Sequence, residues 1–150
     1  MIVTDLNRWR EEFPKDKKIV VTNGCFDIIH AGHIHYLNKA KSFGDYLMIG
    51  INSDSSVRAL KGEGRPVNCQ EYRQYVMDNI RCVDFVYIFN EVRCVDFLKM
   101  ARPDIYVKGG DYTLDTLNKE ELVSLTECGS VIEFVNFKFD ISTTRILTSV

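Results

Sequence analysis

Short apolar runs alternate along the chain with segments in which apolar residues recur every three or four positions. Five of the runs have the length and the β-branched or aromatic content of strands that are buried on both faces. They are residues 18–23 (KIVVTN), 45–52 (DYLMIGIN), 85–89 (FVYIF), 105–108 (IYVK) and 131–135 (VIEFV). Glycine or polar residues bound each run, so the pattern predicts five separate strands.

Helical spacing fills the stretches between these strands. The segments are residues 31–43, 54–60, 70–80, 92–101 and 119–128, and a last short helix is expected to begin at Ser142. In residues 70–80, the apolar positions Tyr72, Val76 and Ile80 share one side of the predicted helix. Residues 1–16 are expected to form an N-terminal helical extension.

The alternation of strands with helices predicts an α/β fold. Right-handed crossovers join neighbouring parallel strands, so we expect a single Rossmann-like domain over residues 1–150, with a parallel β-sheet and helices on both faces. Ligands of such sheets bind outside the carboxyl ends of the strands. This rule groups four segments around one crevice, namely residues 23–33, 52–61, 108–112 and 137–144.

The composition narrows the possible classes of protein. No apolar run approaches the roughly 18 residues that a membrane-spanning helix needs, and the N-terminal residues lack the apolar segment of a secretory signal. A cytoplasmic location is therefore expected. The formal net charge of −2 gives no general attraction to nucleic acid or to acidic membranes, so an anionic ligand must be bound by local groups.

The cysteines do not form a recognisable framework. They are Cys25, Cys69, Cys82, Cys94 and Cys128, an odd number without a C-x-x-C pair. This pattern fits neither a set of disulfides nor a zinc knuckle. We expect reduced thiols, most of them buried.

All the histidines of the chain, His30, His33 and His35, lie in the stretch FDIIHAGHIHY at residues 26–36. A catalytic zinc normally needs three protein ligands, and no acidic or thiolate partner stands at suitable spacing. For His35, a polar position on an amphipathic helix is the simpler interpretation. His30 and His33 follow the strand break at Gly24 and stand at the start of a helix, where free N–H groups and the helix dipole favour an anion. The pattern therefore favours phosphate over a metal.

The sequence HAGH, preceded by NGCFD, resembles the H-x-G-H signature of the nucleotidyltransferase superfamily. Three further blocks stand in the expected order, GINSDSSVRALKGEGRPVN at residues 50–68, RPDIYVKGGDYT at 102–113 and ISTT at 141–144. Together they are most similar to the bacterial D-glycero-β-D-manno-heptose 1-phosphate adenylyltransferases. The resemblance extends over residues 17–148. The glycerol-3-phosphate and ethanolamine-phosphate cytidylyltransferases share H-x-G-H and I-S-T-T, but their middle blocks are less similar.

This resemblance implies a nucleotidyltransferase that moves a nucleotidyl group from a nucleoside triphosphate, expected to be ATP, to heptose 1-phosphate and releases pyrophosphate. The alternatives are a cytidylyltransferase for glycerol 3-phosphate or another small alcohol phosphate or phosphonate, and a nucleotide-binding module without turnover. Mg²⁺ is expected to enter with the triphosphate, bound through phosphates and without protein ligands. A homodimer is expected, without nucleic acid or membrane partners.

The resemblance also implies roles for particular residues. His30 and His33 are expected to donate hydrogen bonds to the α- and β-phosphates as catalytic residues. Lys61, which heads a loop containing Gly62 and Gly64, is the candidate for a mobile catalytic cation, or else a solvated surface lysine. The expected nucleotide-binding residues are Asn23, Gly24, Cys25, Phe26, Asp27, Gly109, Asp111, Tyr112, Ser142, Thr143 and Thr144. Arg58, Arg65 and Arg73 are expected to bind the sugar phosphate, or else to be plain surface residues.

Overall fold

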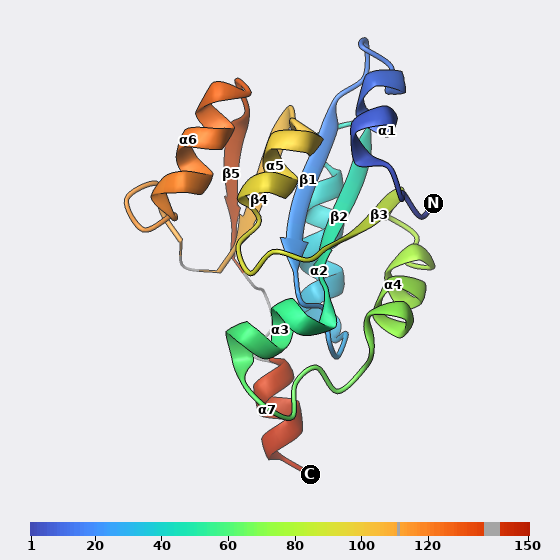
Figure 1. The fold of residues 1–150 in the computed structure, drawn as a ribbon, viewed down its shortest axis with the longest axis vertical. Coiled ribbons are helices and arrows are strands. Elements are labelled where there is room, and N and C mark those ends of the chain that lie inside the picture. The colour runs from blue at the N-terminus through green and yellow to red at the C-terminus, as the bar shows by residue number, and fades with distance from the viewer. Residues whose placement is uncertain (111, 137–141) are drawn as a thin grey trace.

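The computed structural model of the chain describes residues 1–110, 112–136 and 142–150, and strands alternate with helices along it (Figure 1). The strands are β1 (Ile19–Gly24), β2 (Tyr46–Asn52), β3 (Phe85–Phe89), β4 (Ile105–Gly109) and β5 (Val131–Val135). The helices are α1 (Leu6–Glu12), α2 (Ala31–Lys41), α3 (Asp54–Lys61), α4 (Gln70–Asp78), α5 (Val95–Ala101), α6 (Lys119–Glu127) and α7 (Thr143–Thr148). Each predicted strand and helix is therefore present.

The strands form one parallel sheet in the order β3-β2-β1-β4-β5. From β1 the chain moves outward to β2 and β3, and it then returns to the other side of β1 to add β4 and β5. The order therefore reverses between β1 and β4, and this is where open parallel sheets bind their ligands. The α/β Rossmann-like fold predicted from the alternation is confirmed.

Helices cover both faces of the sheet, because successive strand residues point to opposite sides. Ile19 and Val21 belong to one buried cluster, which packs against α1, α5 and α6 through residues such as Phe97. Val20 belongs to a second cluster, which packs against α2 and α4 through residues such as Leu37. The near-continuous apolar strands seen in the sequence are thus explained by burial on two sides.

The structure differs from the sequence pattern most in α4. Tyr72 and Val76, which share one side of the predicted helix, are 68% and 44% exposed, and the helix buries Arg73 and Met77 instead. The reason is a set of polar partners for Arg73 on distant segments, described below. A smaller difference concerns α5, which begins at Val95 and not at residue 92.

The two ends of the chain pack differently. Asp5 caps α1 by accepting a hydrogen bond from the Arg8 N–H, and the backbone of Val3 donates to the Val86 carbonyl beside the edge strand β3. Helix α7 lies beyond the carboxyl ends of the strands, at the same end of the molecule as α3 (Figure 1). Among the described residues, no helix combines the length and the apolar character needed to cross a bilayer.

Candidate active site

A cavity of about 210 Å³ opens at the carboxyl ends of β1 and β4, where the strand order reverses. Its lining consists of Asn23, Gly24, Cys25, Phe26, His33, Tyr36, Lys108, Gly109 and Tyr112. The lining combines residues from segments that the sequence places far apart. The position agrees with the general rule for ligand sites of parallel sheets.

Helix α2 begins at this cavity, and its first turn is capped by two imidazoles. The Nδ1 atom of His30 accepts a hydrogen bond from the Gly32 N–H at 3.1 Å. The Nδ1 atom of His33 accepts one from the His30 N–H at 3.2 Å, which completes a reciprocal capping box. The two ring centroids lie 3.9 Å apart. The histidines therefore hold the helix start and each other.

This cap fixes the protonation state of both rings. A nitrogen that accepts a backbone N–H bond carries no proton, so the neutral tautomer bears its proton on Nε2. Burial lowers the pKa of His33 to about 4, helped by the neighbouring His30, and burial also lowers the pKa of His30. Near neutral pH the pair is uncharged and offers two Nε2–H donors.

The turn before the helix is shaped by Gly24 and Phe26. Phe26 has a φ of 48°, in the left-handed region that non-glycine residues seldom occupy. Its buried ring lies against Gly24, so that a Cβ atom at position 24 would stand 3.1 Å from the ring. The centroids of the Phe26 and His33 rings are 5.6 Å apart. The close approach favours glycine at position 24. Strained backbone of this kind is concentrated at functional sites.

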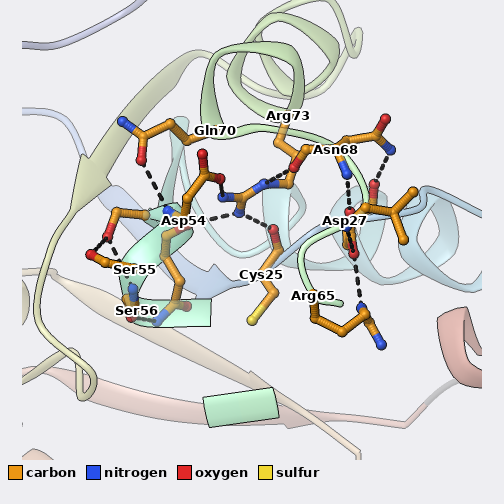
Figure 2. A network of polar contacts seen from close by, with 12 residues as sticks. Cys25, Asp27, Asp54, Ser55, Ser56, Arg65, Asn68, Gln70 and Arg73 are labelled. Carbon is orange, nitrogen blue, oxygen red and sulfur yellow. Dashed lines mark hydrogen bonds and ion pairs between the residues drawn. The ribbon is translucent and has the colours of Figure 1, made fainter. Parts of the chain in front are cut away.

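A polar network joins this turn to the loop between α3 and α4 (Figure 2). The buried Asp27 carboxylate accepts hydrogen bonds from the Val67 and Asn68 backbone N–H groups at 2.8 and 2.9 Å. It also accepts one from Arg65 Nε at 3.0 Å. Burial raises the pKa of Asp27, but these three donors outweigh it and bring the pKa below its usual value. Asp27 therefore holds the loop as an ionised group.

Arg73 occupies the centre of the same network, and its side chain is fully buried (Figure 2). Its Nη1 donates to the carbonyl oxygens of Cys25 and Asn52, both at 2.7 Å. Its Nε donates to the Asn68 carbonyl at 3.0 Å, and its Nη2 to Asp54 Oδ1 at 2.9 Å. The guanidinium thus ties the ends of β1 and β2, the start of α3 and the loop before α4.

Of the other predicted cationic residues, Lys61 and Arg58 are exposed, whereas Arg65 belongs to this network. Lys61 is exposed at the end of α3. Burial raises the pKa of the Cys25 thiol, and the positive charge of Lys61 opposes part of this increase. Arg58 is exposed on the same helix. Arg65 is mostly buried and bound to Asp27. Lys61 is thus placed near the cavity, whereas Arg73 is directed into the protein.

The remaining predicted residues come from the loop after β4 and from the start of α7. Gly109 and Tyr112 line the cavity, and Asp111 lies outside the described residues. Ser142 caps α7 by accepting from the Arg145 N–H at 3.0 Å. The Thr143 hydroxyl donates to the Ile28 carbonyl at 3.1 Å, which brings the start of α7 beside the histidine turn. Thr144 is exposed next to it.

Two cavity residues were missed by reasoning from the sequence, Tyr36 and Lys108. The rule for parallel sheets places Lys108 at the crevice, within residues 108–112, but it assigns no role to this residue. Tyr36 resembles any other core aromatic in the sequence. Its hydroxyl donates to the Val107 carbonyl at 3.0 Å, and this bond joins α2 to β4 under the cavity.

Comparisons with known proteins agree with this geometry. Residues 21–149 match the family model described as cytidylyltransferase-like. The chain is 45% identical over 139 residues to the bifunctional protein HldE of Geobacter sulfurreducens, and 46% identical over 136 residues to that of Campylobacter jejuni subsp. doylei. These alignments cover 93% and 91% of this chain, but the chain spans only 28% of the length of either relative.

Solved structures show the same fold. The lipopolysaccharide core biosynthesis protein from Thermoplasma volcanium has a TM-score of 0.66 and 28% identity, over 83% of this chain and 99% of that one. A pantoate-β-alanine ligase from Francisella tularensis has a TM-score of 0.64 and 12% identity, over 99% of this chain and 76% of that one. At this identity the similarity shows the fold alone. The match over residues 21–149 and the HldE alignments show that the chain belongs to the cytidylyltransferase-like family of nucleotidyltransferases.

Proposed function

We propose that this chain transfers the adenylyl group of ATP to D-glycero-β-D-manno-heptose 1-phosphate and releases pyrophosphate. Membership of the cytidylyltransferase-like family supports the nucleotidyl transfer. The choice of ATP and of the heptose is supported by the sequence blocks at residues 50–68 and 102–113 and by the similarity to proteins named HldE. The similar lipopolysaccharide core biosynthesis protein of Thermoplasma volcanium also supports this choice.

In the proposed reaction a phosphate oxygen of the sugar attacks the α-phosphorus of ATP. An O–P bond forms, the bond from the α-phosphorus to the bridging oxygen of the β-phosphate breaks, and pyrophosphate leaves with that oxygen. A phosphate monoester is largely ionised near neutral pH because its second pKa is about 6. The nucleophile therefore needs no general base, and the protein contributes positioning and charge stabilisation.

The observation that carries this proposal is the pair of Nε2–H donors at the start of α2. The backbone bonds to Nδ1 hold both rings in place before any ligand arrives, so no reorganisation is needed when charge develops on the phosphates. The N-terminal N–H groups of α2 add to the same electrostatic field. Lys61, the start of α7 and the residues of the cavity are proposed to bind the rest of the triphosphate and the nucleoside.

Mg²⁺ is proposed to accompany ATP. In the part of the chain that the structure describes, no group of three or more histidine, cysteine or acidic side chains could hold a metal ion. We propose that phosphate oxygens and water supply the ligands of the ion, as Mg²⁺ bound with a nucleotide keeps several waters. Bound in this way, the ion would neutralise charge on the triphosphate.

A substrate panel with pyrophosphate release as the readout tests the proposal. Turnover is expected with ATP and heptose 1-phosphate, and little turnover with CTP and glycerol 3-phosphate. Turnover only with the second pair would replace the adenylyl assignment by a cytidylyl one. Nucleotide binding without turnover on any acceptor would instead indicate a binding module. Light scattering on the same sample tests the expected homodimer.

A further inference from the structure

A polyphosphate in the cavity needs positive charge beside it, and the histidines do not supply that charge. A polyphosphate carries several negative charges, while the chain as a whole has a net charge of −2 and no general attraction for it. His33 is neutral near pH 7 because its pKa is about 4. Among the described residues that line the cavity, Lys108 carries the one permanent positive charge.

Lys108 is held at the cavity from two sides. Its Nζ lies 3.8 Å from Glu121 Oε2 on α6 and 4.8 Å from the centre of the Tyr112 ring. The side chain is 21% exposed. Within the described part of the chain, Lys108 makes an ion pair and a cation–π contact but no hydrogen bond. An ammonium has three N–H donors, so Lys108 can keep the ion pair and still donate to a ligand in the cavity.

Glu121, the partner of Lys108 in the ion pair, is itself a buried residue of the fold. The residue is 6% exposed, its Oε1 accepts from the Cys94 thiol at 3.3 Å, and its Oε2 has no hydrogen-bond partner among the described residues. A buried carboxylate is costly unless an opposite charge and hydrogen bonds compensate it. Burial and the adjacent Glu121 raise the pKa of Cys94 to about 12, so the thiol stays protonated and donates.

The cavity wall beside this pair is also fixed. The Tyr106 hydroxyl donates to Asn23 Oδ1 at 2.5 Å, linking the strand that carries Lys108 to the end of β1. Burial raises the pKa of Tyr106 well above its ordinary value, so the phenol keeps its proton. Cys94 and Tyr106 are thus neutral donors directed at fixed acceptors, and the carboxylate of Glu121 is one of these acceptors.

We infer that Lys108 is a substrate-binding residue that donates to a phosphate oxygen in this cavity, and that Glu121 is a positioning residue that directs the Lys108 ammonium toward it. A lysine paired at 3.8 Å without a hydrogen bond can donate to an anion and keep its ion pair. The inference rests on the proposed function for the identity of the anion. The phosphate belongs either to the nucleoside triphosphate or to the sugar phosphate.

The test compares Lys108→Gln and Lys108→Arg with Lys99→Gln, a matched change at an exposed lysine on α5. Lys108→Gln is expected to raise the KM of one substrate by roughly 10- to 100-fold, the range for a lost hydrogen bond to a charged group. Lys108→Arg should recover part of the loss, and Lys99→Gln should match wild type. A raised KM for ATP assigns the contact to the triphosphate, and a raised KM for heptose 1-phosphate assigns it to the acceptor.

A double-mutant cycle tests the role of Glu121. Glu121→Gln keeps the size of the side chain and should raise the same KM by a smaller factor than Lys108→Gln does. Because Glu121 acts through Lys108, the double variant should be no weaker than Lys108→Gln alone. Additive losses in the two variants would overturn the positioning role. Unchanged KM values for both substrates in Lys108→Gln would overturn the whole inference.

The test separates this inference from the proposed function. Wild-type pyrophosphate release decides the function, whereas calorimetric titration of wild type and Lys108→Gln with ATP and with heptose 1-phosphate needs no turnover. Weaker binding of either compound to the variant, in a protein that turns over neither, would reject the function and keep the inference. Equal affinities for both compounds would reject the inference.

Discussion

The two sides of the crevice use their polar groups in different ways. On the side of α3 and α4, Arg73 donates to three carbonyls and a carboxylate, and its side chain is fully buried (Figure 2). On the side of α2 and β4, His30 and His33 each accept a backbone N–H through Nδ1, and the Lys108 ammonium makes no hydrogen bond with the described residues.

This difference separates residues that hold the site from residues that can bind a ligand. A buried donor whose partners all belong to the protein adds rigidity but has little left for a substrate. A donor that its own residue's other contacts hold in place at a ligand site is organised in advance for a ligand. We therefore propose a positioning role for Arg73 in place of the sugar-phosphate contact expected from the sequence.

Arg73→Met should give the largest effect, on stability. The substitution leaves three carbonyls without their donor and Asp54, whose side chain is 32% exposed, without its ion pair. Each carbonyl left buried and unsatisfied costs about 1–3 kcal/mol of the free energy of unfolding. Chemical denaturation measures the change. Arg58→Met, the same substitution at an exposed position of α3, should stay within about 0.5 kcal/mol of wild type. Equal stability of the two variants would contradict the assignment of Arg73.

His33→Gln should give the next largest effect, on turnover. Glutamine can accept the His30 N–H in a capping box, so the helix start is retained, while the rigid ring that fixes the Nε2–H donor is replaced by a flexible amide. We expect turnover to fall by roughly 10²- to 10³-fold, the range for losing one preorganised donor, with an unfolding temperature near that of wild type. His33→Ala, which also loses the cap, should be the less stable of the two. Wild-type turnover in a folded His33→Gln variant would remove His33 from the mechanism.

Asp27→Asn should give an intermediate effect on the loop between α3 and α4. One carboxylate oxygen that accepts backbone N–H bonds becomes an amide N–H₂ group, and a buried donor without its partner costs about 1–3 kcal/mol. Hydrogen exchange at Val67 and Asn68 should accelerate, while exchange in β1 should change little. Unaltered exchange at both amides would show that Asp27 does not anchor the loop.

A change of pH should give the most gradual effect, because it is spread over the interval between the two pKa values of His33. The pKa of His33 is about 4 in the folded protein, against an ordinary value of 6.5, so the unfolded chain binds more protons between these values. Stability should therefore be full above pH 6.5 and fall as the pH drops toward 4. The unfolding temperature of His33→Gln should fall less over this window. If the unfolding temperatures of wild type and His33→Gln changed identically with pH, the pKa of His33 would not be lowered in the folded protein.

Much of the fold could be predicted because its signals are local. The strand at residues 85–89 has the predicted bounds, since Asp84 and Asn90 flank a run buried in the sheet. The start of α5 was predicted less accurately, because Cys94 caps this helix without a side-chain hydrogen bond. The histidine pair was also found locally, since the capping contacts join residues two and three positions apart.

The rest of the site depends on contacts that no local pattern contains. The buried side of α4 follows from Arg73, whose partners stand as far away as Cys25 in the sequence. Helical spacing alone favours the apolar Tyr72 over an arginine for burial. The sequence places Lys108 at the crevice, but its proposed role depends on Glu121 of α6, which only the structure shows beside it. Such long-range polar contacts are set by tertiary packing.

The central claim is that His30 and His33 present Nε2–H donors to the phosphates of a bound nucleotide. A crystal structure with a non-hydrolysable ATP analogue tests it most directly. We predict phosphate oxygens within about 3.2 Å of both Nε2 atoms, with both Nδ1 atoms still bound to the backbone. A triphosphate that points away from the start of α2 would contradict the account.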